Sequence, residues 1–286
     1  MSRIDRLDPA WLDAQYDNRA RVPEHPAVFE RWRQASRLAR EGARCQLDIA
    51  YGDGADERLD VFPAAQPGAP VLVFIHGGYW RAFDKADHSF VAPSFVADGA
   101  AVVVPNYSLC PAASIEQIAL QLTRVVAWVA RHAAGFGADP SRIALAGHSA
   151  GGHLAAMLLC CRWKEVDADL PLLPVQGALG ISGLYDLEPI RLTPFLAADL
   201  QLTPASVKRL SPAFFPRPKR PLYAVVGGDE SEEYLHQNQL IRDQWGPTAV
   251  PVCETLVGHH HFSILSNLAD PAGRLHDLAL RLLGLR

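Results

Sequence analysis

A serine between two glycines follows one of the most apolar segments of the chain. Gly147-His148-Ser149-Ala150-Gly151 comes directly after RIALA and leads into GHLAAMLL, which has the composition of a buried helix. A G-x-S-x-G sequence between a strand and a helix is typical of a nucleophile elbow, which exposes the serine hydroxyl above the end of a sheet. Glycines flank it because side chains in so tight a turn would collide. We therefore expect Ser149 to be a catalytic nucleophile; the alternative is a serine that only caps the helix.

A second glycine-rich segment matches what a serine nucleophile also needs, which is a set of hydrogen-bond donors for an oxyanion. His76-Gly77-Gly78-Tyr79-Trp80 follows the apolar run PVLVFI. In such a loop the small residues let backbone N–H groups face the cavity beside the nucleophile. The sequence predicts an oxyanion hole formed by the amides of Gly78, Tyr79 and Ala150. The alternative is an ordinary turn after a buried strand, and His76 is expected to be structural because the loop uses its backbone.

Acidic residues follow one of the last two predicted strands, and histidines follow the other. In hydrolases with a nucleophile elbow, the catalytic residues come in the chain order serine, acid, histidine, and this sequence has the same order. Residues 227–234 read GGDESEEY, and residues 258–262 read GHHHF. Catalytic groups gather at the carboxyl ends of parallel strands, so we expect one carboxylate here to orient one imidazole. The remaining acids are expected at a solvated helix start. From these residues alone, the acid stays open between Asp229 and the glutamates, and the base among the three histidines.

Three consecutive histidines also raise the question of a metal site. Neighbouring side chains diverge on an extended segment, and no further ligand stands three or four positions beyond these histidines. The five cysteines are scattered and form no C-x-x-C pair. We therefore expect no metal and no cofactor.

Strand and helix signals alternate along the chain, which indicates an α/β fold with a mostly parallel sheet and helices on both faces. The segments PVLVFI, AAVVVP and RIALAG are almost continuously apolar, as in strands that are buried on both faces. The first two predicted strands are more polar and close together, so we expect them to form an antiparallel hairpin at the edge of the sheet. The eight predicted strands are 45–51, 57–62, 70–75, 100–105, 142–147, 176–181, 221–226 and 250–256.

The helices that must position the motifs have recognisable ends. Ser114 and Gln117 form a capping-box pattern at the start of one amphipathic helix, and Asp270-Pro271 is expected to start the last helix. Two further helices, about 9–17 and 26–41, are expected before the sheet. We expect residues 1–286 to form a single domain, in which the irregular, Pro- and Leu-rich segment 186–211 is a small lid over the site.

Length, composition and charge argue against several classes of protein. The chain has 286 residues, a formal net charge of −4 and a pI near 6.2. Binding to nucleic acid or to an anionic membrane usually requires an excess of positive charge, so neither is expected. Its apolar runs are too short to span a bilayer, and its charged N-terminal sequence lacks the apolar centre of a secretion signal. Scattered cysteines are typical of reduced thiols. We expect a cytoplasmic protein that acts on a small molecule, and we leave homodimer formation open.

Longer motifs resemble the kynurenine formamidase (arylformamidase) group, close to the hormone-sensitive-lipase-like esterases. The resemblance extends from about residue 10 to the C-terminus, and it implies an α/β-hydrolase fold with Ser149 as the nucleophile. The motifs that carry it are HGGYW at 76–80, NYSLCP at 106–111, GHSAGGH at 147–153, SGLYDLEPI at 182–190, and the ESEEYLHQ and HHF segments.

The same resemblance implies which acid and which histidine complete a triad. The acid of this group lies in an acid-Ser-x-Glu-Phe pattern, which here reads ESEEY at 230–234 and therefore selects Glu230 over Asp229. The histidine of the group directly precedes a phenylalanine, which selects His261. A related esterase pattern, His-x-Phe, would select His260 instead.

The resemblance also implies a reaction, the hydrolysis of N-formylkynurenine or a similar aryl formamide. Two alternatives stay open: a general carboxylesterase that acts on small acyl esters, and a catalytically silent binding protein on the same fold. The silent binding protein would be expected to lack the serine, the base or the HGG loop, all of which are present.

Aromatic and cationic residues near the motifs are candidates for substrate binding. We expect an aromatic pocket formed by six residues near the motifs, although each residue alone is equally compatible with core packing. The six are Tyr79, Trp80, Phe83, Tyr107, Tyr185 and Phe195. An amino-acid head group would need a charged partner, for which Arg81, Lys85 and Arg191 are candidates.

Overall fold

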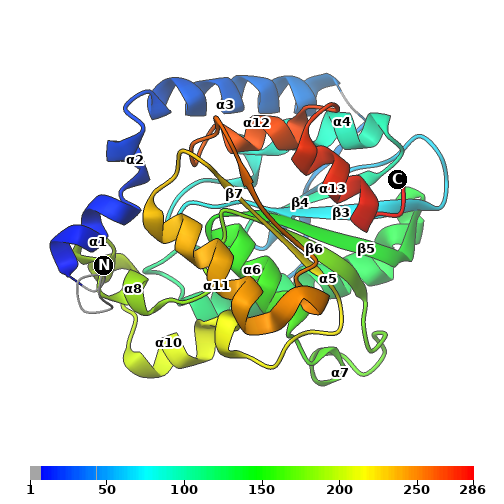
Figure 1. Ribbon diagram of the computed structural model, residues 1–286. Helices are drawn as coiled ribbons and strands as arrows, with labels where there is room; N and C mark the ends of the chain where they lie inside the picture. The colour runs from blue at the N-terminus through cyan, green and yellow to red at the C-terminus, as the bar shows by residue number, and fades with distance from the viewer. Residues whose placement is uncertain (1–7, 43) are drawn as a thin grey trace.

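The computed structural model describes residues 8–42 and 44–286, and its centre is a single twisted sheet (Figure 1). The eight strands lie in the order β1-β2-β4-β3-β5-β6-β7-β8. The β1–β2 and β2–β4 pairs are antiparallel, and every other neighbouring pair is parallel. The predicted eight-stranded, mostly parallel sheet with a hairpin at its edge is confirmed.

The bounds of the elements follow the predicted ranges closely. The strands are β1 (Gln46–Ala50), β2 (Arg58–Phe62), β3 (Ala69–Ile75), β4 (Ala101–Pro105), β5 (Ala138–His148), β6 (Val175–Ile181), β7 (Leu222–Gly227) and β8 (Val252–Leu256). The α-helices are α1 (Pro9–Tyr16), α2 (Asn18–Arg21), α3 (His25–Gly42), α4 (Ala92–Ala97), α5 (Ile115–His132), α6 (Ala150–Leu159), α7 (Trp163–Val166), α8 (Glu188–Arg191), α9 (Pro194–Leu200), α10 (Pro204–Leu210), α11 (Glu232–Ala249), α12 (Ile264–Ala269) and α13 (Arg274–Leu282).

Helices cover both faces of the sheet, so its central strands are buried throughout. In β3, Val71, Val73 and Ile75 join one hydrophobic cluster, while Leu72 and Phe74 join the other. The first cluster includes residues of α5, α6 and α11, and the second includes residues of α3, α4, α12 and α13 (Figure 1). Burial on both faces is the physical reason for the continuous apolar runs that predicted these strands.

The predicted helix ends are confirmed in one place and wrong in another. At α5, the Ser114 hydroxyl accepts from the Gln117 amide at 3.3 Å, and the Gln117 side chain accepts from the Ser114 amide at 2.8 Å, which is the expected capping box. The last helix begins at Arg274 rather than at Asp270-Pro271. The Asp270 carboxylate instead accepts from the Ala272 amide at 2.9 Å, so it closes a turn between α12 and α13.

The segment 186–211 is helical, contrary to the expectation of irregular structure. It contains α8, α9 and α10, each of which has a proline at its first or second position. Prolines at these positions start helices, so the composition reflects several short helices in succession. Its role as a lid stays a prediction. Within the two described ranges, no helix combines the length and apolarity that crossing a bilayer requires.

Candidate active site

Ser149 lies at the sharp turn where β5 ends and α6 begins. Its backbone has φ 57° and ψ −117°, a strained conformation for a residue with a side chain. A Cβ on Gly147 would lie 2.1 Å from the carbonyl oxygen of Gly151, and one on Gly151 would lie 2.0 Å from that of Ile75. Any larger residue at these two positions would therefore collide with the backbone. The turn has the geometry that the motif predicted.

The HGG loop lies directly beside this serine. A Cβ on Gly77 would lie 3.1 Å from the Cβ of Ser149. The next two residues, Gly78 and Tyr79, have φ values of 100° and 49°, which turn the chain out of the line of β3. In the part of the chain that the structure describes, no hydrogen bond uses the amide of Gly78, Tyr79 or Ala150 as a donor. These three amides are thus available to a ligand.

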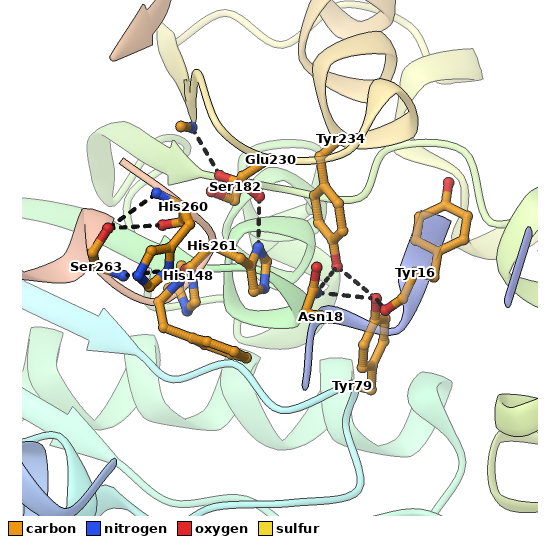
Figure 2. A network of polar contacts seen from close by, with 12 residues as sticks. Tyr16, Asn18, Tyr79, His148, Ser182, Glu230, Tyr234, His260, His261 and Ser263 are labelled. Carbon is orange, nitrogen blue, oxygen red and sulfur yellow. Dashed lines mark hydrogen bonds and ion pairs between the residues drawn. The ribbon is translucent and has the colours of Figure 1, made fainter. Parts of the chain in front are cut away.

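A buried carboxylate and a buried imidazole meet at the carboxyl ends of β7 and β8 (Figure 2). Glu230 Oε2 lies 2.6 Å from His261 Nδ1, and the two residues are only 7% and 4% exposed. The other carboxylate oxygen accepts from the Ser182 hydroxyl at 2.5 Å and from the Gly227 amide at 2.8 Å. Because a carboxylate can only accept, His261 carries its proton on Nδ1, which leaves Nε2 free to accept one.

The neighbouring acid, Asp229, and the neighbouring histidines, His259 and His260, do not take part in this pair. Asp229 is exposed, and its amide donates to the carbonyl oxygen of His259 at 3.1 Å. The His260 ring accepts from the amides of Phe262 and Ser263 at 3.2 Å, with its other nitrogen 3.6 Å from Glu24. The geometry therefore pairs Glu230 with His261 and with neither of the other two histidines.

His148, to which the sequence analysis assigned no role, forms a hydrogen bond with the backbone of His261. Its Nε2 lies 2.8 Å from the carbonyl oxygen of His261, so Nε2 must be the donor. Burial lowers the pKa of His148 well below its ordinary value, and the nearby His261 lowers it further. A neutral His148 thus tethers the backbone of His261 next to the elbow.

Ser149 and His261 open onto one cavity of about 610 Å³. Among the described residues no hydrogen bond joins the serine hydroxyl to the imidazole; such contacts are often long in a ligand-free site. Tyr79 lies in the wall, as do aromatic residues from distant parts of the chain. The aromatic members of the wall are Tyr16, Phe29, Trp32, Tyr79, Phe83, Phe195 and Phe262.

Comparison with known proteins agrees with this geometry. A match to the BD-FAE family covers residues 59–233. A kynurenine formamidase from Danio rerio is 31% identical over 255 residues, which is 86% of this chain and 84% of the relative. The chain belongs to the BD-FAE family. As the motifs predicted, this BD-FAE member is similar to the kynurenine formamidases.

Other relatives of this BD-FAE member are esterases. Esterase LipQ of Mycobacterium tuberculosis is 29% identical over 251 residues, which is 77% of this chain and 58% of LipQ. A crystal structure from Silicibacter sp., provisionally described as that of a thioesterase, superposes with a TM-score of 0.82 at 30% identity and covers 92% of this chain and 97% of its own. The fold is that of the α/β-hydrolases, and the chain is a hydrolase.

Of the six predicted aromatic pocket residues, three line the cavity of this BD-FAE protein, namely Tyr79, Phe83 and Phe195. The other three, Trp80, Tyr107 and Tyr185, do not. Trp80 and Tyr185 are fully buried and Tyr107 nearly so. The Tyr107 ring stacks on His76 at 4.3 Å, and its hydroxyl donates to the His76 carbonyl oxygen at 2.8 Å, which holds the HGG loop from within. For Trp80, Tyr107 and Tyr185 the prediction was wrong, because their side chains point into the core and pack against the elements that carry the motifs.

The N-terminal helices contribute a cavity wall that the sequence did not reveal. Tyr16 and Asn18, from α1 and α2, and Phe29 and Trp32, from α3, all line the cavity. The only signal was the i, i+3 spacing of Phe29 and Trp32, which places both rings on one face of a helix. That spacing does not distinguish a cavity wall from ordinary core packing.

One of the three candidate cations lies at the cavity. Arg81 forms an ion pair with Asp199 and lies over the Phe195 ring at 5.3 Å. Lys85 is instead buried between two aspartates, and Arg191 pairs with Glu188 on α8 at 2.6 Å. Asp17 and Arg19 also line the cavity, so charges of both signs surround its aromatic wall.

Proposed function

We infer that this chain hydrolyses aryl formamides of the N-formylkynurenine type, using Ser149, His261 and Glu230 as a catalytic triad. The observation that carries this proposal is the buried Glu230–His261 pair, whose imidazole lines the same cavity as the elbow serine. The similarity to kynurenine formamidases favours this substrate class. A cytoplasmic location and a small-molecule substrate belong to the same proposal.

The proposed reaction is an acyl transfer in two steps. His261 Nε2 takes the proton of Ser149 as Oγ attacks the formyl carbon, and Glu230 stabilises the imidazolium that forms. The amides of Gly78, Tyr79 and Ala150 donate to the oxyanion. His261 then protonates the departing aniline nitrogen, and water hydrolyses the formyl ester on Ser149 by the reverse sequence of proton transfers.

The aromatic wall of the cavity supports an aromatic leaving group. A formyl group needs almost no room, so most substrate contacts fall to the aryl portion. The Phe29 ring lies 4.9 Å, centroid to centroid, from the Phe83 ring and 4.9 Å from the Phe262 ring, in edge-to-face contacts at the cavity. Such a wall offers both faces and edges to a further aromatic ring.

N-Formylkynurenine is therefore expected to have a higher kcat/KM than an aliphatic ester such as ethyl butyrate, because contacts with the aryl portion, which the aliphatic ester lacks, contribute to transition-state binding. Side-by-side steady-state assays with the purified protein measure this ratio. Efficient hydrolysis of butyrate with formylkynurenine left intact would contradict the substrate assignment. It would favour the carboxylesterase that the similarity to LipQ supports as a second candidate.

Arg81 is expected to recognise the amino-acid tail of such a substrate, with Asp199 beside it for the ammonium group. Replacing Arg81 with Met should raise KM for N-formylkynurenine about tenfold, because a charge-assisted hydrogen bond is lost. KM for formanilide, which lacks the tail, should change little. Arg191→Met is the matched control, since Arg191 forms its ion pair outside the cavity. An equal rise of KM for both substrates would exclude tail recognition.

A further inference from the structure

A buried asparagine from the N-terminal helices lines the cavity and has no part in the proposed triad. Asn18 is the first residue of α2, is 5% exposed, and faces the same cavity as Ser149 and His261. Its Nδ2 donates to the Tyr234 hydroxyl at 2.9 Å and, over a longer distance of 3.4 Å, to the Tyr79 hydroxyl. In the view of Figure 2, Asn18 lies between His261 and Tyr79.

The two tyrosine hydroxyls determine which way the Asn18 amide faces. The Tyr79 hydroxyl lies 2.8 Å from the carbonyl oxygen of Tyr16, and because a carbonyl can only accept, Tyr79 is the donor. The proton in the 2.6 Å contact between the two hydroxyls must then come from Tyr234. With both hydroxyl protons in use, Tyr234 can only accept from Asn18. The NH₂ group of the amide therefore faces the hydroxyls, and the oxygen faces away from them.

The oxygen of this amide is free to bind a ligand. In the part of the chain that the structure describes, both hydrogen bonds of the Asn18 side chain use Nδ2, and none uses Oδ1. Oδ1 is not enclosed by protein, in contrast to the oxygen of Asn238, which is enclosed and also lacks a partner. A buried side chain with an unpaired acceptor gains free energy when a ligand donates to it. Asn18 thus offers the cavity an acceptor whose orientation is fixed.

This acceptor lies at the end of the cavity where the leaving group must depart. Asn18 and His261 both contact Tyr234: the amide contacts its hydroxyl at 2.9 Å, and the imidazole contacts its ring, with 4.5 Å between the ring centroids. In the proposed reaction His261 protonates the leaving atom, so that atom must lie next to the imidazole. Asn18 is therefore close to the bond that breaks.

We propose that Asn18 is a specificity-determining residue, whose Oδ1 accepts a hydrogen bond from the N–H of the amide that is cleaved. The proposal rests on the proposed function and deepens it, because it names secondary amides, in preference to esters, as the substrate class that the site recognises. An ester has no hydrogen on its leaving oxygen, so it leaves Oδ1 without a partner. A site that binds a substrate N–H discriminates against an analogue that lacks it.

The hydrogen bond also orients the leaving nitrogen. Once Ser149 has attacked the formyl carbon, the nitrogen carries one hydrogen and one lone pair, and His261 must protonate that lone pair. If the N–H is held by Asn18 Oδ1, the lone pair is free to face the imidazole. An ester oxygen has two lone pairs and no hydrogen, so its protonation needs no such orientation. The N–H proton stays on the nitrogen throughout, and no covalent bond forms at Asn18.

Asn18→Leu, which keeps the size of the side chain and removes the acceptor, is expected to lower kcat/KM for formanilide about tenfold. Phenyl formate has the same formyl and phenyl groups with an oxygen in place of N–H, so its kcat/KM should fall by less than about threefold. The ratio of the two values is the quantity to measure, since altered packing around the tyrosines affects both substrates. Asn18→Asp keeps an acceptor oxygen and should retain the wild-type ratio.

Asn238→Leu is the matched control. Asn238 is also buried, but its Nδ2 donates to the Glu254 carbonyl oxygen at 3.3 Å, away from the cavity, so both rates should stay within about twofold. An amide-to-ester ratio that is unchanged in Asn18→Leu would overturn the role of Asn18. If Asn18→Leu does not fold, Asn18→Ala is judged by the same ratio.

The wild-type protein separates this inference from the proposed function. If it hydrolyses formanilide while the ratio does not change in the variant, only the role of Asn18 is wrong. If it hydrolyses phenyl formate and leaves formanilide intact, the proposed function is wrong as well.

Discussion

Replacing Ser149 with alanine is expected to lower kcat by about 10⁴-fold or more while the protein stays folded, because triad members act as a unit. Alanine keeps the Cβ that lies beside Gly77 and requires no change at φ 57°, so only the oxygen is removed. Without that oxygen no acyl-enzyme can form, and the residual rate reflects substrate binding and the oxyanion donors. Steady-state kinetics and thermal unfolding of the same preparation measure both effects.

Ser114→Ala provides the comparison for this substitution. It also removes one serine hydroxyl, but that hydroxyl caps α5. We expect it to lower the free energy of unfolding by about 1 kcal/mol and to leave kcat near the wild-type value. A Ser149→Ala protein with kcat within tenfold of wild type would contradict the assignment of the nucleophile.

Glu230→Gln is expected to lower kcat by about 10²- to 10⁴-fold, because the histidine loses the charge that orients and stabilises it. The amide that replaces the carboxylate can donate to His261 Nδ1. That interaction favours a proton on Nε2, the nitrogen that must accept the proton of Ser149. Ser182 and the Gly227 amide, which now donate to the carboxylate, would still hold the side chain in place.

Asp229→Asn is the neighbouring control for this acid. Asp229 is exposed and touches the site only through its backbone amide, so kcat should change by less than about threefold. Rate measurements on the two variants under identical conditions give the ranking. The opposite ranking would transfer the role of the acid from Glu230 to its neighbour.

The sequence predicted the sheet and the elbow because both depend on local patterns. RIALAG is apolar since β5 is buried on both faces, and the tight turn itself requires Gly147, whose Cβ would collide with the backbone of Gly151. Neither Glu230 nor His261 could be chosen from local chemistry alone, since each stands among similar residues. Resemblance selected them, and the geometry pairs them at 2.6 Å.

Only part of the cavity wall was predicted correctly, because the wall depends on where side chains point and on contacts between distant residues. Tyr79 lines the cavity while its neighbour Trp80 is in the core, and nothing in the dipeptide distinguishes the two. The Tyr16 hydroxyl donates to Glu233, 217 positions along the chain. Such a contact exists only once the sheet has brought α1 next to α11.

Labelling with a fluorophosphonate probe tests the central claim, that Ser149 is an activated nucleophile, most directly. The probe reacts with serines that a neighbouring base activates, so peptide mass spectrometry of the wild-type protein should find one probe per chain, on Ser149. Glu230→Gln should be labelled far more slowly, and Ser149→Ala not at all. Stoichiometric labelling of a different serine, or equal labelling of Ser149→Ala, would contradict the account.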